Sequence, residues 1–174
     1  QCPTLLQNGF GGHRIEGIGD KHVPWVHDCK DTDFVIAVDD EVPMRLLRLF
    51  NEEKGREALT AKGVSPDLVE KLELLGISGI GNMLAAVKFA KYNELTEEDY
   101  VVSIATDSMQ LYGSRLDELT EERGRYTDIL ARQDIQLLEM RETPGLGTKA
   151  GDDAYIAQYR GQSMDGFDFQ VEKD

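Results

Sequence analysis

Three short segments of this chain hold residues that could line a cofactor cleft. Each combines glycines, which let a backbone approach a ligand closely, or hydroxyl and carboxylate groups that can hydrogen-bond to one. In chain order they are His13 to Asp20, Gly76 to Asn82 and Thr106 to Ser108. Ligands of open α/β sheets bind beyond the carboxyl ends of strands, near loops and helix N-termini. We therefore interpret the three segments as one side of a cleft whose other side lies outside this chain.

The first two segments are weak signals when each is taken alone. Gly17, Ile18 and Gly19 do not make a dinucleotide fingerprint, because His22 stands at the third glycine position and no strand clearly precedes the turn. The residues from Ser78 onward could hold an anion at the start of a helix. They would serve equally as a tight turn and cap, and in isolation that second interpretation is favoured.

Composition limits the function classes. A chain of 174 residues is long enough for one domain with a core, and a net charge of -14 makes nucleic acid an unlikely partner. Cys2 and Cys29 form no Cys-x-x-Cys pair, which favours a reducing cytoplasm over a disulfide framework. No apolar run reaches the roughly 20 residues of a membrane span. Because there is neither a signal peptide nor an initiator methionine, we expect a piece of a longer protein.

The elements that would position these segments are those of an α/β fold. Nearly unbroken apolar runs at 33–38 and 100–105 predict strands buried on both faces, which favours a parallel sheet. Asp39 or Asp40 can cap a helix that carries Pro43 in its first turn. Further helices are expected at 65–75, where Ser65 and Pro66 mark the start, at 82–92, and in a charged stretch at 117–123.

Taken together, the three segments resemble the fold-type-II pyridoxal-phosphate enzymes, the group of cysteine synthase and cystathionine β-synthase. His13 to Gly19 is similar to the family's loop over the substrate side of the cofactor, and Gly76-Ile77-Ser78 to its glycine turn, although Gly79 to Gly81 depart from the usual residues. Thr106 to Ser108 matches the strand end whose serine hydrogen-bonds the pyridine nitrogen. The resemblance covers residues 1–134, the C-terminal part of such a domain.

The resemblance implies a partial doubly wound, mainly parallel sheet, as in an incomplete tryptophan-synthase-β-like large domain. It implies pyridoxal 5'-phosphate as the cofactor and cofactor contacts at Ser108, Gly17, Ile18, Gly19 and Ser78. A serine hydroxyl donates to a neutral pyridine but cannot hold a proton on it, which suits β-elimination and β-replacement on a small amino acid. Two alternatives stay open: the carboxylate of Asp107 could face the nitrogen, or Ser108 could simply cap a helix.

The family's Schiff-base lysine and phosphate loop have no counterpart in this chain. Lys21 lies near the first glycine turn, yet its family position gives it no covalent role. We therefore expect little or no activity as a lyase or transferase from the chain alone, and association with the missing N-terminal half, another chain or a second copy. His13, His22 and His27 are interpreted as loop or packing residues, so no metal is expected.

The tail, 135–174, is turn-rich and carries a second resemblance. Residues 137–174, with Thr143-Pro144-Gly145-Leu146-Gly147, are similar to the flavin-binding component of Rnf-type redox-driven ion pumps. The sequence that carries the covalent flavin phosphate in that family is absent, so no flavin site is carried over. The alternative to a pyridoxal-phosphate enzyme fragment is thus a non-catalytic structural or electron-transfer-associated piece, or a composite of two sequences.

Overall fold

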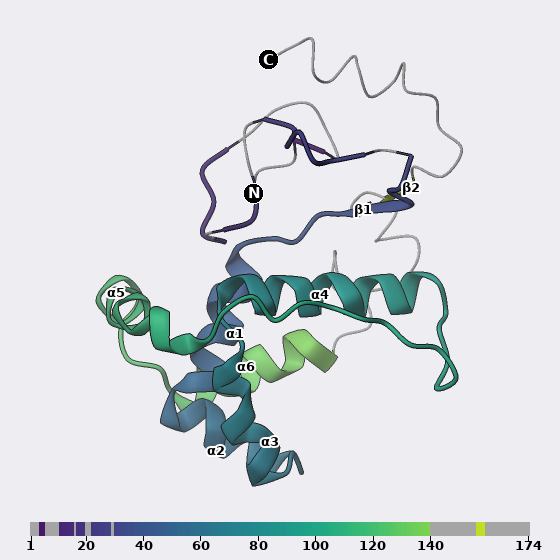
Figure 1. Ribbon diagram of the computed structural model, residues 1–174. Coiled ribbons are helices and arrows are strands. Elements are labelled where there is room, and N and C mark those ends of the chain that lie inside the picture. The colour runs from purple at the N-terminus through teal and green to yellow at the C-terminus, as the bar shows by residue number, and fades with distance from the viewer. Residues whose placement is uncertain are drawn as a thin grey trace.

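The computed structural model describes residues 4–5, 11–15, 17–19, 22–28, 30–139 and 156–158, and this part of the chain is mostly helical (Figure 1). Its elements are β1 (Phe34–Ile36), α1 (Glu41–Asn51), α2 (Glu53–Ala61), α3 (Pro66–Lys71), η1 (Leu72–Leu74), α4 (Ile77–Tyr92), η2 (Met109–Leu111), α5 (Gly113–Arg123), α6 (Asp128–Glu139) and β2 (Ile156–Gln158).

Helix α4 lies across the middle of the molecule. The segment that carries β1 lies on one side of it, and α1, α2, α3 and α6 lie on the other (Figure 1). The core fills the space between α4 and these helices, where burial of apolar side chains stabilises the fold. Its fully or almost fully buried members include Met44, Leu46, Leu47, Leu49, Ile77, Ile80, Leu84, Leu119 and Ala131.

Of the two acidic residues predicted to cap α1, Asp40 is the N-cap residue but makes no side-chain cap hydrogen bond, whereas Asp39 does contact the first turn. The carboxylate of Asp39 accepts a hydrogen bond of 2.9 Å from the amide of Glu41, the first helical residue. The helix ends at Asn51 because Glu52 is extended, with φ -85° and ψ 147°. The chain then folds back so closely that a β-carbon at Gly55 would overlap the backbone of Leu49, which explains a glycine early in α2.

The helix predicted at 65–75 is present as α3 followed by η1. Ser65 caps it as expected, since its hydroxyl accepts a hydrogen bond of 3.3 Å from the amide of Leu68. The apolar face is smaller than the sequence pattern indicated. Val69 is buried, whereas Leu68 and Leu74 are exposed.

Helix α4 begins earlier than predicted. It starts at Ile77, so Ser78 and Gly81 lie in its first turns and do not form a separate tight turn before residue 82. Gly76 is the N-cap residue and has no side chain with which to cap. Each helical glycine costs about 1 kcal/mol relative to alanine. Burial of the whole start of α4 offsets that cost, because Ile77 and Ile80 are fully buried there.

The expected parallel sheet is not found among the described residues. β1 confirms the strand predicted at 33–38, in shorter form, but it pairs antiparallel with β2, with Phe34 opposite Gln158. Residues 100–105 are extended yet form no strand within the described part of the chain. An apolar run predicts an extended backbone, but a strand also needs a neighbour for its backbone hydrogen bonds, and the local pattern does not specify one.

The remaining helices complete the described chain. α5 confirms the predicted charged stretch, with Leu119 as its buried residue. α6 was not predicted. It extends past residue 134, where the sequence analysis ended the first domain, and that boundary stays a prediction. In the described ranges no single helix is long and apolar enough to cross a bilayer. The bent pair Pro66–Leu74 and Ile77–Tyr92, at 115°, meets that criterion only as a pair.

Candidate functional site

The three segments singled out in the sequence meet around the start of α4. A β-carbon at Gly17 would lie 3.2 Å from the hydroxyl oxygen of Ser78, so the first segment touches the second. The amide of Gly76 donates a hydrogen bond of 3.0 Å to the carbonyl of Asp107, which joins the second segment to the third. The predicted proximity of the three segments is therefore seen in the fold.

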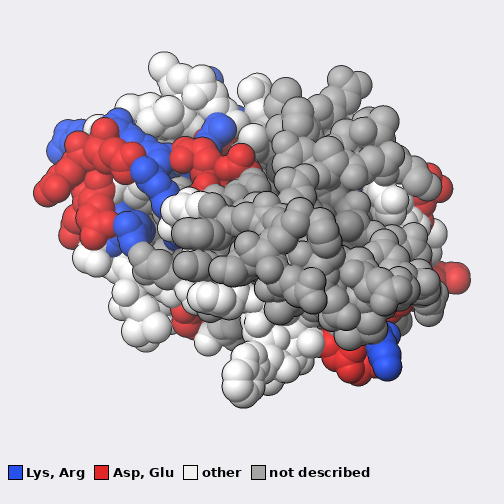
Figure 2. Space-filling model, turned by 90° about the horizontal axis from the view of Figure 1, so that it is seen from above, with Lys and Arg blue, Asp and Glu red and all other residues white. Residues whose placement is uncertain are grey.

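The first segment is held by Arg14. Its backbone amide donates to the carboxylate of Asp40 at 2.8 Å. Its guanidinium donates to both carboxylate oxygens of Glu122 on α5, at 3.0 and 2.8 Å, a planar pairing that fixes orientation. This hydrogen bond lowers the pKa of Glu122 and raises the pKa of Arg14. Figure 2 shows acidic and basic side chains interspersed on the side where α5 lies.

The turn itself requires glycine. Gly17 has φ +89° and Gly19 has φ +91°, a region that residues with a β-carbon rarely adopt. Between them, the amide of Ile18 donates to the carbonyl of Ile15 at 3.4 Å. The side chain of Ile18 lies against α4, where a β-carbon at Gly81 would meet its Cδ1 atom at 3.4 Å. The glycine at position 81 therefore admits the turn to the helix surface.

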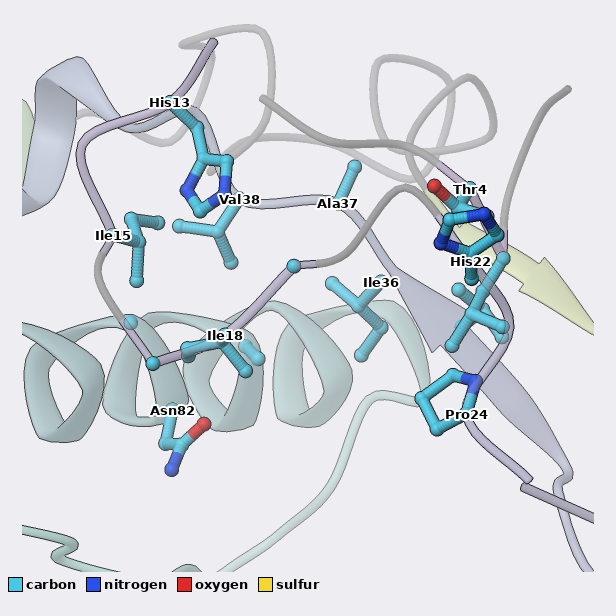
Figure 3. Close-up of a pocket in the computed structure, with 16 residues that line it drawn as sticks. Thr4, His13, Ile15, Ile18, His22, Pro24, Ile36, Ala37, Val38 and Asn82 are labelled. Carbon is cyan, nitrogen blue, oxygen red and sulfur yellow. The ribbon is translucent and has the colours of Figure 1, made fainter. Parts of the chain in front are cut away.

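A cavity of about 490 Å³ lies between this turn, the segment around β1 and α4 (Figure 3). Its volume is within the range of small-molecule sites. The described lining is largely apolar, with imidazole, hydroxyl and amide groups but no amine or carboxylate. It consists of Thr4, Leu5, His13, Ile15, Gly17, Ile18, Gly19, His22, Pro24, Val35, Ile36, Ala37, Val38, Gly81, Asn82 and Ala85.

The five predicted cofactor contacts occupy different places relative to this cavity. Gly17, Ile18 and Gly19 line it. Ser78 is 5% exposed and lies behind Gly17 rather than on the described lining. Ser108 is also absent from that lining and lies beyond the Gly76 end of α4. The structure thus brings the segments together without directing all five residues into one space.

Ser108 is the N-cap residue that precedes η2, but its side chain makes no cap hydrogen bond. Its backbone carbonyl accepts the amide of Leu111 at 3.2 Å, and no described residue hydrogen-bonds its hydroxyl. The neighbouring Asp107 is engaged locally, because its carboxylate accepts from the hydroxyls of Tyr112 and Thr106. Of the two groups that compete for a ligand in this segment, the Ser108 hydroxyl is the one that the described residues leave available.

One residue that shapes the site, Lys88, was not predicted. Lys88 is 4% exposed, and its ammonium donates at 2.7 Å to the carbonyl of Ala37, which braces the cavity wall against α4. A lysine within the otherwise apolar run 83–90 was the available signal. Asn82, which ends the predicted second segment, lines the cavity from α4, and its side-chain amide donates to the carbonyl of Ile104 at 3.0 Å (Figure 3).

The histidines do not meet. His13 and His22 line opposite ends of the cavity (Figure 3). Within the described residues, no group of three or more His, Cys, Asp or Glu side chains is placed to hold a metal ion. The cavity as described can therefore bind a small, mainly apolar group, but its described lining offers no amine for a covalent cofactor link.

This chain resembles a known protein over most of its length. The chain is similar to cystathionine beta-synthase of Saccharomyces cerevisiae. The two are 30% identical over 147 residues, which are 82% of this chain and 26% of that protein, so the chain spans about a quarter of its relative. No family model matches the chain, and no solved structure does.

This similarity supports a relationship with the fold-type-II pyridoxal-phosphate enzymes, the first of the two resemblances seen in the sequence. The second, to a flavin-binding redox protein, is supported by none of the comparisons. Its residues also lie outside the described part of the chain, except 137–139 and 156–158.

Proposed function

We propose that this chain is one part of a pyridoxal-phosphate-dependent enzyme that carries out β-elimination or β-replacement on a small amino acid. Another polypeptide segment supplies the covalent lysine and the phosphate loop. The observation that carries the proposal is the meeting of the Gly17 turn, Ser78 and the Asp107-Ser108 segment at one end of α4. The similarity to cystathionine beta-synthase supports it independently.

In this proposal Ser108 contacts the ring nitrogen of the cofactor. Pyridoxal phosphate, when bound, supplies a ring that withdraws electrons from the substrate. The Ser108 hydroxyl donates a hydrogen bond to the neutral nitrogen, whereas a carboxylate would hold a proton there and make the ring a stronger electron sink. Two observations support this role for Ser108 rather than Asp107. The described residues leave the Ser108 hydroxyl available, and the carboxylate of Asp107 accepts a hydrogen bond from Tyr112.

The glycine turn has a different role in the proposal. Gly17, Ile18 and Gly19 form a wall on the substrate side, and Ser78 supports that wall from behind. The mainly apolar cavity beside the turn excludes water and accepts a short side chain rather than a second charged group. Arg14 keeps the turn in place through Asp40 and Glu122. An electron-transfer role is not favoured, because the tail resemblance on which it depends has no support.

A segment exchange tests this proposal. The matched segment of the Saccharomyces cerevisiae relative is replaced by this chain, and the purified protein is assayed for bound cofactor by absorption and for β-replacement turnover. We expect cofactor to be retained, and turnover to fall about tenfold or more in Ser108→Ala but not in the matched control Ser103→Ala. Cofactor loss in a folded exchange protein, or equal behaviour of the two variants, would contradict the proposal. Turnover by the isolated chain with added cofactor would also contradict it.

A further inference from the structure

The segment Tyr100 to Ala105 is an extended apolar run that the described fold does not cover. Tyr100 and Val102 are 93% and 92% exposed, Ile104 is 71% exposed, and Val101 on the alternate side is 43% exposed. Isolated apolar side chains on a surface are ordinary, but consecutive ones mark an interaction site. This segment runs beside α4 (Figure 1).

The residues on both sides of this segment are anchored by hydrogen bonds, while the backbone between them remains open. At its start, the carboxylate of Asp99 accepts the amide of Thr96 at 2.7 Å and fixes the preceding turn. At its end, the carbonyl of Asp107 accepts the amide of Gly76. Between them, the described residues supply one hydrogen bond, from the Asn82 side chain to the carbonyl of Ile104. Such a pre-ordered open edge is suited to pairing with another strand.

The charges around the segment indicate what kind of strand would pair with it. Acidic residues flank the apolar run, and the sequence has no lysine or arginine between Lys91 and Arg115. Opposite charges on paired strands stabilise a sheet, whereas like charges that face each other destabilise it. The flanking acidic residues are Glu94, Glu97, Glu98, Asp99 and Asp107.

These charges disfavour a second copy of this chain. In an antiparallel pair centred between Val102 and Ser103, Glu98 would face Asp107 of the other copy at both ends of the ladder. A parallel pair would place the stretch from Glu97 to Asp99 beside its own copy. A partner strand with basic flanks avoids both of these carboxylate–carboxylate repulsions.

We propose that Tyr100 to Ala105 is a docking strand for an extended polypeptide segment of β-branched apolar residues flanked by lysines or arginines. The apolar side chains of the partner cover the exposed run, and its backbone completes the open ladder. Its basic flanks pair with Glu97 and Glu98 at one end and lie near the negative charge of Asp107 at the other. The inference does not depend on the proposed cofactor, because it rests on exposure, backbone and charge alone.

Two labelled peptides with the same Val-Ile-Val-Ile-Val core test this inference by fluorescence anisotropy with the full chain. One carries two lysines at each end and the other carries two glutamates. We expect the lysine peptide to bind at least about tenfold more tightly, with the difference shrinking as salt is raised. Hydrogen exchange of the unmodified chain should show new protection of the amides of residues 100–105 with the lysine peptide. Equal binding of both peptides, or protection elsewhere only, would overturn the proposal.

Variants distinguish binding at the docking strand from nonspecific binding to exposed apolar side chains. Val102→Pro removes a backbone donor and should weaken binding of the lysine peptide about tenfold or more. Ile129→Lys is the matched control, because Ile129 is 69% exposed on α6, and it should bind the peptide as the unmodified chain does. Circular dichroism checks that both variants keep their helices. If one variant loses its helices, the hydrogen-exchange measurement still tests the proposal, because it uses the unmodified chain. A dimer in sedimentation that Val102→Pro dissociates would identify a second copy as the occupant and overturn the proposal.

Discussion

Gly17 and Ser78 are in contact across two segments that lie far apart in the sequence. A β-carbon at Gly17 would stand 3.2 Å from the hydroxyl oxygen of Ser78, and Gly17 also has φ +89°. Glycine is therefore favoured at position 17 for two separate reasons: the positive φ of the backbone, and the lack of space for a β-carbon beside Ser78. This contact fixes the distance between the cavity wall and the start of α4.

The substitution Gly17→Ala should destabilise the chain more than backbone strain alone would. The positive φ costs an alanine about 1 kcal/mol, and the Ser78 contact adds to that cost. Gly63→Ala is the matched control, because Gly63 has φ +93° and nothing within 4 Å of an added β-carbon. The free energies of unfolding in urea should differ, with Gly17→Ala the less stable variant. Equal losses in the two variants would show that the contact with Ser78 is unimportant.

The junction between the second and third segments should also lose stability when a β-carbon is added at Gly76. Gly76→Ala would place a β-carbon into the carboxylate of Asp107 and near the ring of Tyr112, although the backbone at position 76 is not strained. We expect a loss of about 1–3 kcal/mol from overpacking. Gly113→Ala, where nothing lies within 4 Å, should be neutral or slightly stabilising at the start of α5. Thermal unfolding of both variants checks this, and a neutral Gly76→Ala would refute the tight junction.

The stability of the helical core should fall at high pH because of Tyr126. Burial, then the hydrogen bond of 2.6 Å to Asp134, raises the pKa of this phenol above its ordinary value. Above about pH 10 the unfolded chain releases the tyrosine proton while the folded chain keeps it, so stability drops by up to about 1.4 kcal/mol per pH unit.

Tyr126→Phe should remove this part of the pH dependence, whereas Tyr100→Phe, at a fully accessible side chain, should retain it. Urea unfolding from about pH 9 to 11 measures the slopes. Identical slopes in Tyr126→Phe and the unmodified chain would contradict the assignment.

Lys88 should stabilise the cavity wall through its bond to the carbonyl of Ala37. Lys88→Met keeps the length of the side chain but removes the donor, and we expect a loss of about 1–3 kcal/mol because this bond lies out of water. Lys71→Met, at the exposed end of α3, serves as the control and should change stability little. If Lys88→Met were as stable as that control, the bracing role would be wrong.

Local signals in the sequence predicted the elements whose causes are local. Ser65 before Pro66 marked α3, and the acidic residues before Pro43 marked α1. The start of α4 was missed because Gly79 and Gly81 look like breakers. Their place in the helix is explained only by tertiary packing, since an added β-carbon would meet Leu75 at position 79 and Ile18 at position 81.

Long-range partners were harder to predict. The apolar pattern at 100–105 predicted an extended backbone but could not specify a neighbouring strand, and no parallel sheet forms among the described residues. The meeting of the glycine turn with Ser78 was expected from the family resemblance. The position of Ser108 outside the described cavity lining was not expected. It depends on where η2 begins after the extended segment, which the local sequence does not specify.

The protonation of the cofactor's ring nitrogen tests the central claim, which is that this chain tunes a pyridoxal ring through Ser108. The segment-exchanged enzyme is loaded with cofactor labelled with nitrogen-15 in the ring, and the chemical shift of that nitrogen is recorded. We expect a neutral nitrogen in the unmodified protein and in Asp107→Asn, and a protonated one in Ser108→Asp. A nitrogen that is protonated in the unmodified protein and neutral only in Asp107→Asn would contradict the account.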